Sequence, residues 1–563
     1  MNKKVQVILL ILVFFFAFFL RFYKLGEIPN GLYQDESAIG YNAYSILETG
    51  RDEHGKFMPL YFKSFGDWKL PVYIYVAVVP IKILGLNEFA VRFPSAFFGS
   101  LSIIFFYFIV KQISGNRKIA TISSLLLAIN PWHIQFSRSG FEVNVALFFS
   151  LLGIWAFLKS LNGSKILPFM ILCIFSFVLS LYSYNVTRLL SPLILLVLIY
   201  YYRSNLRKIP AKYTVITLLL FGILLLPFLL TLFSLSGFNS ARGALITSAD
   251  IQVNFTEFRS YLINIPNIIS SVFFNRWIML FWQYLENLVS SFSTAFFFLT
   301  GSKHGNQGIG NVGTFYLFQF PLIIAGLILI LKEKLKRYYF FLIFAIICFL
   351  VLGLSKEVPH ATRGYFIVVP FQVFSALGLT YFWNLRRNIK RRLRLALIFF
   401  SSFIVFFNII FYLTSYYFRF PVLYAKSWRS EDKTLSLYLK ENEHKYSKII
   451  FDNTAGFIYS SLLFYFPYPP SEFQTKAVRY PDDSEGFSHV KSFGKYEFKN
   501  VEWPSDYENN RDTLIVTSAE RKPNDIPSIK TFYYPQRPVV FSIKEKIIQY
   551  PIQEVAYVLV ETR

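Results

Sequence analysis

The chain has 563 residues, of which 54% are hydrophobic and only 16% are charged. About a quarter of the residues of a soluble domain are charged, so this composition argues against an ordinary soluble enzyme, a disordered chain and a fibrous repeat. A net charge of +24 is typical of proteins that bind nucleic acid, but the positions of the basic residues argue against that function. Residues 1–416 carry 37 Lys and Arg against 14 Asp and Glu, whereas residues 417–563 carry 20 and 19. The basic residues of 1–416 are scattered between apolar runs, which indicates a membrane protein with basic loops.

The apolar runs predict about eleven membrane-spanning helices, and the first of them begins close to the N-terminus. After Lys3 and Lys4 an apolar stretch reaches Leu20 without a small-residue cleavage site, so we expect an uncleaved helix with its N-terminus inside. Each run is about long enough to cross a bilayer. The other ten lie near 94–112, 118–136, 142–160, 165–182, 188–202, 213–233, 314–331, 338–354, 364–384 and 395–416.

Two further apolar runs, Pro71–Leu86 and Trp277–Leu299, are ambiguous, and the positive-inside rule indicates whether they cross the membrane. If neither crosses, the loops assigned to the cytoplasmic side hold 21 basic residues and one acid, Glu333. Counting either run as a span breaks this pattern. We therefore expect both to lie along the outer interface, with the N-terminus inside and the C-terminus outside the cytoplasmic membrane.

This topology gives three outer segments. The first outer loop, residues 22–93, holds eight of the fourteen acids of 1–416, although acids contribute little to membrane insertion. The second large outer loop is 234–313. Residues 417–563 alternate a helical stretch, Lys433–Glu443, with short β-like runs at 448–451, 513–516, 539–543 and 555–560, which predicts a small extracytoplasmic α/β domain.

The acid pair Asp35-Glu36 follows the first helix closely. A carboxylate at the membrane surface can accept a proton from a hydroxyl group, which makes the pair a candidate general base. The alternative is that Asp35 caps a helix N-terminus, because Asp is a preferred cap residue. Ala38 stands where a capping box would have Glu or Gln.

Three other outer positions carry charges that suit a phosphate. Lys69, in Gly66-Asp67-Trp68-Lys69-Leu70-Pro71, can meet a lipid phosphate or simply reach the headgroups. Arg138 and Glu142 have helical i, i+4 spacing, so they form either a local ion pair or part of a cavity. Arg363 precedes a helix, where it can bind an anion or anchor the helix at the interface. Cations that can bind a leaving phosphate, together with a base that can deprotonate a hydroxyl, favour transfer of a group from a lipid phosphate.

The sequence resembles the dolichyl-phosphate-mannose protein mannosyltransferase family and its bacterial relatives, the lipid A aminoarabinose transferases. The resemblance covers about residues 1–190 and extends more loosely to 384. It rests on Gly31-Leu32-Tyr33-Gln34-Asp35-Glu36, Gly66-Asp67-Trp68-Lys69-Leu70-Pro71, Ala90-Val91-Arg92-Phe93-Pro94-Ser95-Ala96, Asn130-Pro131-Trp132-His133 and Phe136-Ser137-Arg138-Ser139-Gly140-Phe141-Glu142.

The resemblance implies a C-type membrane glycosyltransferase fold in residues 1–416 and an inverting transferase that uses a polyprenyl-phosphate sugar on the outer face. It implies that Asp35 is the catalytic base, with Glu36 completing the acidic pair, and that Lys69 faces the donor phosphate. Arg138 and Arg363 are expected to bind the same phosphate. Supporting or acceptor-binding roles are expected for Glu142, Asp67 and His360. Leu70 stands where relatives often have a second proline.

We therefore expect an enzyme that transfers a sugar to a hydroxyl group of a protein, lipid or glycan, without a cofactor. Asp35, Glu36 and Asp67 could in principle hold a divalent metal, but adjacent acids on one loop are weak ligand sets, and no metal site is expected. A polymerase or ligase of lipid-linked glycans is an alternative, distinguished by a diphosphate-linked donor. A transporter or flippase is another, but such proteins have related halves with broken helices, and the sequence shows no repeat.

Overall fold

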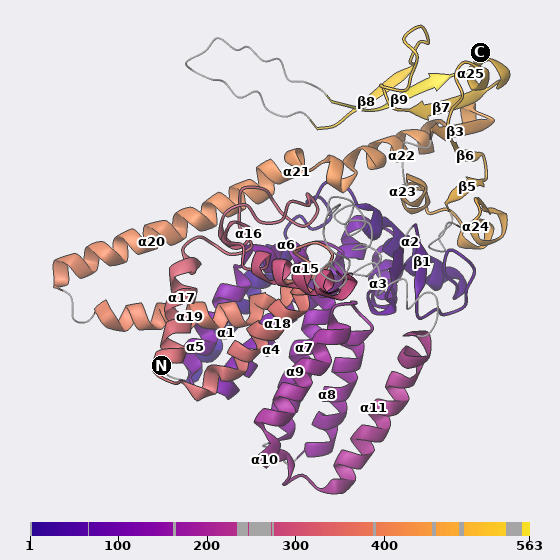
Figure 1. Ribbon diagram of the computed structural model, residues 1–563. Helices are drawn as coiled ribbons and strands as arrows, with labels where there is room; N and C mark the ends of the chain where they lie inside the picture. The colour runs from indigo at the N-terminus through magenta and orange to yellow at the C-terminus, as the bar shows by residue number, and fades with distance from the viewer. Residues whose placement is uncertain are drawn as a thin grey trace.

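The computed structural model divides into a helical bundle and a C-terminal sheet, drawn at the bottom and top of Figure 1. It describes residues 3–65, 67–161, 165–232, 246, 272, 275–386, 390–452, 458–482, 489–535 and 554–562. The expected run 539–543 and most of the second large outer loop up to residue 274 lie outside these ranges.

Each of the eleven expected spans falls on a helix of the bundle, which confirms the polytopic helical fold. Seven of the described helices on these spans are long and apolar enough to cross a membrane, three more (Ile166–Leu181, Thr187–Tyr201 and Gln319–Lys332) are shorter apolar helices, and the 12-residue helix Arg117–Ala128 belongs to neither group. The eleven helices are α1 (Lys3–Phe22), α4 (Glu88–Ser114), α5 (Arg117–Ala128), α7 (Glu142–Ser160), α8 (Ile166–Leu181), α9 (Thr187–Tyr201), α11 (Ala211–Leu232), α17 (Gln319–Lys332), α18 (Tyr339–Gly353), α19 (Val368–Leu385) and α20 (Arg391–Thr414).

One expected span, 118–136, is broken into two helices. α5 ends at Ala128, and the short helix α6 (Pro131–Ser137) follows. The break occurs at Asn130, whose side chain accepts a hydrogen bond from the backbone N–H of His133 at 2.9 Å and so caps α6. Pro131 has no N–H for a continuing helix and suits the first turn of a new one. Only α5, with 12 residues, remains of that span.

The two runs that were not expected to cross also form helices. α3 (Pro71–Leu84) buries one face against α2 (Gln34–Thr49) and α4, and the 14-residue helix is shorter than a bilayer is thick. α15 (Arg276–Ser290) is amphipathic, with exposed Trp277, Phe281 and Trp282 on one side and Asn287 buried on the other. In Figure 1 both lie near the level where the bundle meets the C-terminal sheet. Short helix α16 (Thr294–Phe298) follows α15.

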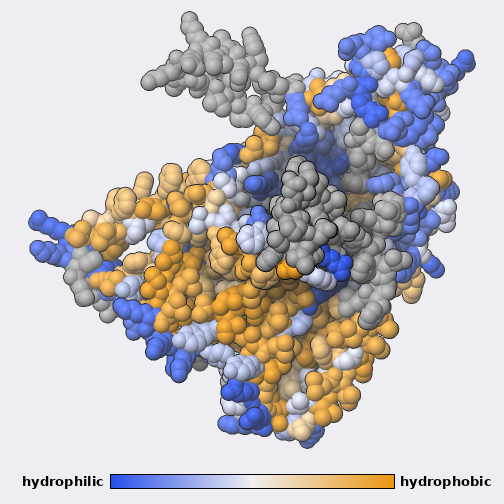
Figure 2. Space-filling model, viewed as in Figure 1, coloured by the Kyte–Doolittle hydropathy of each residue, from blue (hydrophilic) through white to orange (hydrophobic). Residues whose placement is uncertain are grey.

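The surface divides as expected for a protein in a bilayer. Figure 2 shows an apolar surface over the helices of the bundle, with hydrophilic clusters at its lower edge and over the C-terminal sheet. Exposed apolar side chains are dense on α11 and α20, for example Leu219, Ile223, Phe399 and Phe406. A water-soluble protein rarely exposes such continuous apolar faces, whereas lipid accommodates them.

The first loop, residues 22–93, contains α2 (Gln34–Thr49) and a short hairpin of strands β1 (Phe62–Ser64) and β2 (Asp67–Lys69). The two strands are antiparallel, with Phe62 opposite Lys69. α3 follows the hairpin directly. The first loop is therefore a folded layer on the end of the bundle, and it carries the residues on which the site depends.

The C-terminal part is a small α/β domain, as predicted. Its sheet has the order β4-β5-β6-β3-β7-β9-β8, with β3 parallel to β6 and β7 and the other pairs antiparallel. The predicted runs 448–451, 513–516 and 555–560 are strands. The strands are β3 (Lys448–Asp452), β4 (Val478–Arg479), β5 (Val490–Phe493), β6 (Tyr496–Lys499), β7 (Thr513–Thr517), β8 (Lys530–Tyr533) and β9 (Val555–Glu561). Helices α21 (Phe420–Leu423), α22 (Ser430–Asn442), α23 (Ile458–Tyr465), α24 (Pro470–Lys476) and α25 (Ser505–Asn509) accompany them.

The α/β domain shares a hydrophobic core with the first loop. Ala38, Tyr41 and Phe65 belong to the same buried cluster as residues of α22, α23 and β3. Gly40 of α2 lies so close to α23 that an added Cβ atom would come within 2.6 Å of the Phe464 ring. The two parts are therefore packed as one unit, and the first loop lies between the bundle and the sheet.

Candidate active site

Two fully buried arginines hold the segment between α1 and α2. Arg138, which follows α6, donates from Nη2 to the carbonyl oxygens of Lys24 at 3.3 Å and Ile28 at 3.1 Å. Its Nη1 donates to the carbonyls of Leu20, Arg21 and Tyr23, and its Nε donates to the hydroxyl of Tyr416. Both Nη groups of Arg138 thus bind carbonyls at and just after the C-terminal end of α1, and its Nε binds Tyr416. This speaks against the expected contact of Arg138 with a donor phosphate.

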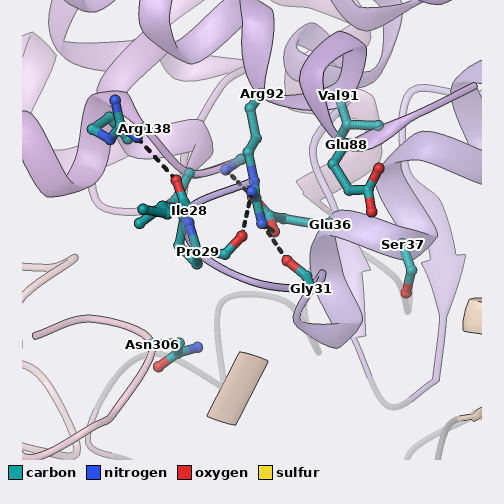
Figure 3. Close-up of polar contacts among 12 residues, drawn as sticks. Ile28, Pro29, Gly31, Glu36, Ser37, Glu88, Val91, Arg92, Arg138 and Asn306 are labelled. Atoms are coloured by element: carbon teal, nitrogen blue, oxygen red, sulfur yellow. Dashed lines mark hydrogen bonds and ion pairs between the residues drawn. The ribbon is translucent and has the colours of Figure 1, made fainter. Parts of the chain in front are cut away.

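The second arginine, Arg92 of α4, pairs with Glu36 (Figure 3). Its Nε and Nη2 approach the two carboxylate oxygens of Glu36 at 3.0 and 2.9 Å, and both side chains are fully buried. Arg92 also donates to the carbonyls of Leu25, Pro29 and Gly31. The carboxylate of Glu36 accepts a further hydrogen bond of 2.7 Å from the backbone N–H of Gly140.

The position of Glu36 differs from the one expected for a member of a catalytic pair. Its carboxylate is enclosed and engaged on both oxygens, so it has no open side toward a substrate. A bidentate pair of this kind orients two buried groups rigidly. Glu36 therefore serves to fix α2 on α4 and on the segment between α6 and α7, and it positions its neighbour Asp35.

Asp35 has a different environment. It is the second residue of α2, and the N-cap is Tyr33, which makes no side-chain cap hydrogen bond. The capping alternative for Asp35 is thereby excluded. Its Oδ1 accepts a hydrogen bond of 2.6 Å from the Nζ of Lys69, and its side chain remains 34% exposed. Asp35 thus combines a cationic partner with access to a substrate.

Lys69 lies at the end of β2, where the hairpin buries its side chain to 1% exposure. The ammonium group lies 5.6 Å from the centre of the Phe65 ring. A lysine enclosed in this way is not a flexible group reaching for the headgroups, which was the alternative reading. Asp67 lies in the same strand, and its side chain is outside the described part of the structure.

The charges of three carboxylates act on the hydroxyl of Tyr33. Burial and then the charges of Asp35, Glu142 and Glu36 raise the pKa of the Tyr33 hydroxyl well above its usual value. Glu142 lies in the first turn of α7, where a carboxylate is stabilised by the helix dipole. Glu142 and Asp35 therefore both act on the pKa of Tyr33, and the supporting role of Glu142 stays a prediction.

Arg363 and His360 lie in the loop between α18 and the short helix η2 (Tyr365–Ile367). Among the contacts of the described residues, the Nη1 of Arg363 is buried and has no hydrogen-bond partner. His360 is buried, and its Nδ1 lies 3.0 Å from the Oγ1 of Thr362. A buried guanidinium nitrogen without a partner favours an anionic ligand.

The loop between α8 and α9 connects this region to Lys69. On one side, the carbonyl of Tyr182 accepts a hydrogen bond from the N–H of Val72, three residues after Lys69. On the other side, the hydroxyl of Tyr184 donates to Thr362, next to Arg363, at 2.8 Å. The lysine and the arginine therefore belong to loops that meet at the same end of the bundle.

A chain of packed aromatic rings makes a second connection. Tyr33 packs on Phe141 with ring centres 5.4 Å apart, Phe141 on Phe136 at 4.6 Å, and Phe136 on Tyr365 at 4.7 Å. Tyr33 and Tyr365 each lie two residues from a candidate site residue, Asp35 and Arg363. Asn144 completes the connection, since its Oδ1 accepts a hydrogen bond from the Tyr365 hydroxyl.

Arg188 is a site candidate that the sequence reasoning missed. It lies in the first turn of α9 and donates to the hydroxyl of Tyr61, in the first loop, at 2.7 Å. Its Nε and Nη1 are buried and have no hydrogen-bond partner among the described residues. The signal in the sequence was an arginine at the very start of an apolar run, in Tyr184-Asn185-Val186-Thr187-Arg188.

Two of the acids considered as metal ligands, Asp35 and Glu36, each have a cationic partner. Asp35 is paired with Lys69 and Glu36 with Arg92, and cations next to these carboxylates disfavour a bound metal ion. One other group of metal-ligating side chains is described, consisting of His304, Glu357 and His360.

Comparison with known protein families gives one match. Residues 69–230 match the family model of the dolichyl-phosphate-mannose-protein mannosyltransferases. No curated protein sequence matches the chain significantly.

Three solved structures have a similar fold. ArnT from Cupriavidus metallidurans in the apo state has 11% sequence identity and a TM-score of 0.53, and the match covers 99% of this chain and 98% of that one. The same protein bound to undecaprenyl phosphate has 10% identity, with the same TM-score and coverage. The Archaeoglobus fulgidus oligosaccharyltransferase tethered to an acceptor peptide has 14% identity and a TM-score of 0.50 over 82% of this chain. This chain spans 63% of that protein's length.

The shared architecture with ArnT extends over both the bundle and the α/β domain. The resemblance expected from the sequence is thus confirmed: residues 69–230 match the dolichyl-phosphate-mannose-protein mannosyltransferase family, and the chain as a whole has the fold of ArnT.

Proposed function

We propose that this protein is an integral membrane glycosyltransferase that moves a sugar from a polyprenyl-phosphate donor to a hydroxyl acceptor. The observation that carries the proposal is the pair formed by Asp35 and Lys69, with Oδ1 and Nζ 2.6 Å apart. A partly exposed carboxylate beside an enclosed ammonium supplies the two groups that the reaction needs. The family match and the ArnT-like fold support the same reaction class.

In the proposed reaction the bond between the sugar's anomeric carbon and the phosphate oxygen breaks, and the phosphate keeps the electron pair. Lys69 would neutralise the charge that develops on that phosphate, as cations do in phosphoryl-group binding. Asp35 would take the proton of the acceptor hydroxyl as its oxygen bonds to the anomeric carbon. A single displacement from the opposite face inverts the configuration of the sugar.

Two arginines extend the proposed phosphate site. Arg363 and Arg188 both have buried N–H groups without partners among the described residues, and these groups suit phosphate oxygens. The proposed phosphate ligands are therefore Lys69, Arg363 and Arg188. Arg138 is left out because its N–H groups hold the end of α1.

The donor is proposed to be lipid-linked because the site lies at the end of an apolar bundle. The ArnT relative was solved with undecaprenyl phosphate, which is a polyprenyl phosphate. The oligosaccharyltransferase relative holds an acceptor peptide, whereas the acceptor proposed here is a hydroxyl group of a protein, lipid or glycan. The excess of basic residues in the opposite loops supports a site on the outer face of the cytoplasmic membrane.

The experiment that tests the proposal is a donor assay with the purified protein in detergent or nanodiscs. Labelled sugars on polyprenyl monophosphate and on polyprenyl diphosphate are offered separately with a mixture of hydroxyl acceptors. Transfer from the monophosphate supports the proposal. Transfer from the diphosphate alone would identify a glycan polymerase or ligase, and donor movement across proteoliposomes without transfer would identify a flippase.

A further inference from the structure

Two loops that are far apart in the sequence bring three metal-ligating side chains together. His304 belongs to the loop between α16 and α17, and Glu357 and His360 belong to the loop between α18 and η2. Their ligand atoms all lie within 4.8 Å of one another. The Oε2 of Glu357 is 3.1 Å from the Nε2 of His304 and 4.0 Å from the Nε2 of His360.

These distances are close to those that a small divalent cation imposes. Zinc binds imidazole nitrogen and carboxylate oxygen at about 2.0–2.2 Å in tetrahedral geometry, which separates two ligand atoms by roughly 3.4 Å. The Glu357–His304 distance of 3.1 Å is slightly shorter and the Glu357–His360 distance of 4.0 Å slightly longer. His304 and Glu357 are exposed, so rotation of their side chains can close the site without moving the backbone.

His360 is held in the orientation that a ligand needs. Its Nδ1 contacts the Oγ1 of Thr362 at 3.0 Å, and Thr362 accepts a hydrogen bond from Tyr184. This leaves the Nε2 of His360 facing Glu357. Metal-bound histidines generally have such a partner on the second ring nitrogen.

We propose that His304, Glu357 and His360 bind one divalent cation of the zinc type. Two imidazoles and one carboxylate are a ligand set that zinc accepts, with the fourth position open to water on the exposed side. Mg²⁺ and Ca²⁺ fit less well because they prefer oxygen ligands. Sequence spacing could not group these ligands, because 52 residues that include two membrane helices separate His304 from Glu357.

The cation would connect the loop after α16 to the loop that carries Arg363. The first of these loops is also attached to α6, because the Nε2 of Gln135 donates to the carbonyl of Asn306 at 3.1 Å. With the cation bound, α6, the His304 loop and the Arg363 loop form one continuous network. The cation would therefore fix the position of Arg363, and it is not assigned a part in the transfer step.

The test is Zn²⁺ binding to the purified full-length protein. The protein is first treated with a chelator to remove bound metal, and the chelator is then removed. We expect one Zn²⁺ per chain, measured by titration calorimetry and by elemental analysis after gel filtration. Co²⁺ in place of Zn²⁺ is expected to give the visible absorption of a tetrahedral site. His304→Ala and Glu357→Gln should each weaken Zn²⁺ binding by more than about 100-fold, because even outer partners of a metal site contribute roughly 10- to 100-fold.

His444→Ala is the matched control, since His444 is an exposed histidine of the α/β domain outside the cluster. This variant should bind Zn²⁺ as the wild type does. Thr362→Val keeps all three ligands and should weaken binding by about 10- to 100-fold through the orientation of His360. Absence of stoichiometric binding to the wild type, or equal affinity in the wild type and the His304→Ala and Glu357→Gln variants, would overturn the proposal. Neither outcome depends on the donor assay.

Discussion

Asp35 and Glu36 show how adjacent carboxylates acquire different roles from their surroundings. Glu36 is fully enclosed and meets a guanidinium and a backbone N–H, whereas Asp35 meets an ammonium and stays 34% exposed. A buried pair such as Glu36–Arg92 costs about 3–5 kcal/mol when one partner is removed, because the other charge stays buried. Glu36 thus belongs to the framework, and Asp35 is the member of the pair that a substrate can reach.

A pH-sensitive contact lies between the first loop and the α/β domain. Burial raises the pKa of Glu53 to about 7, although the nearby charge of Arg479 and hydrogen bonds from Asn42 and Ser64 act against this shift. The folded protein therefore holds a proton on Glu53 that the unfolded chain has lost above its usual pKa. Stability from this group is complete below about pH 4.5 and is lost as the pH rises through 7.

We predict that thermal stability falls between pH 5 and pH 8 by up to about 3 kcal/mol from Glu53 alone. Glu53→Gln keeps a neutral hydrogen-bonding side chain and should remove most of this pH dependence. The matched control is Glu48→Gln, at an exposed carboxylate of α2. Melting curves across this pH range measure the effect. An unchanged pH slope in Glu53→Gln would contradict the assignment.

At the residue scale, the sequence predicted the site only in part. Asp35 was identified because acids contribute little to membrane insertion, and Lys69 because a lysine at the interface can meet a lipid phosphate. The structure brings the two residues together. The partners of Glu36 and Arg138 could not be predicted. Arg92 lies 56 residues after Glu36, and Arg138 binds backbone carbonyls more than 100 residues away, so local spacing contains no trace of either contact.

At the scale of elements, the turn between α1 and α2 depends on arginines supplied by other helices. Arg138 uses its planar guanidinium to bind several carbonyls at once, which a lysine cannot reproduce. We predict that Arg138→Lys lowers the free energy of unfolding by on the order of 3 kcal/mol, through lost charged hydrogen bonds. The apparent KM for the donor should stay unchanged in the folded fraction.

The melting temperature and a donor titration of Arg138→Lys distinguish two roles of Arg138, which are support of the turn after α1 and binding of the donor phosphate. Arg207→Lys, at an exposed arginine of a connecting loop, is the control and should alter neither quantity. A raised KM with normal stability in Arg138→Lys would restore the role in phosphate binding that the sequence indicated.

Most elements could be predicted, since hydrophobic runs and alternation report burial directly. The runs at 448–451, 513–516 and 555–560 are the central strands β3, β7 and β9. The break between α5 and α6 was missed because hydropathy is continuous across it, although Asn130-Pro131 marks a cap and a first turn. The hydrophobic pattern thus predicts which segments form helices or strands, and the capping residues determine where those elements end.

At the scale of the whole molecule, the proposed site requires that one side of the membrane holds the first loop, the Arg363 loop and the α/β domain. The structure packs these parts together at one end of the bundle. We predict that cysteines introduced at Glu48 and Lys356 react with a membrane-impermeant maleimide in intact cells. Cysteines at Arg207 and Lys332 should react only after permeabilisation, because their loops are basic.

All four positions are exposed, and the native Cys173 and Cys348 are buried, so labelling reports the introduced residues. Labelling of position 48 and position 207 from the same side would contradict the topology. Reversal of all four results would preserve the site but move it to the cytoplasmic face.

The central claim is that Asp35 acts on the acceptor beside a phosphate held by Lys69. The most direct test is the rate of sugar transfer from a polyprenyl-phosphate donor by Asp35→Asn, per mole of folded and membrane-inserted protein. The account predicts a loss of at least about 100-fold, since a positioned general base contributes roughly 10²- to 10⁴-fold. A wild-type rate in this variant would show that the carboxylate next to Lys69 is not the base.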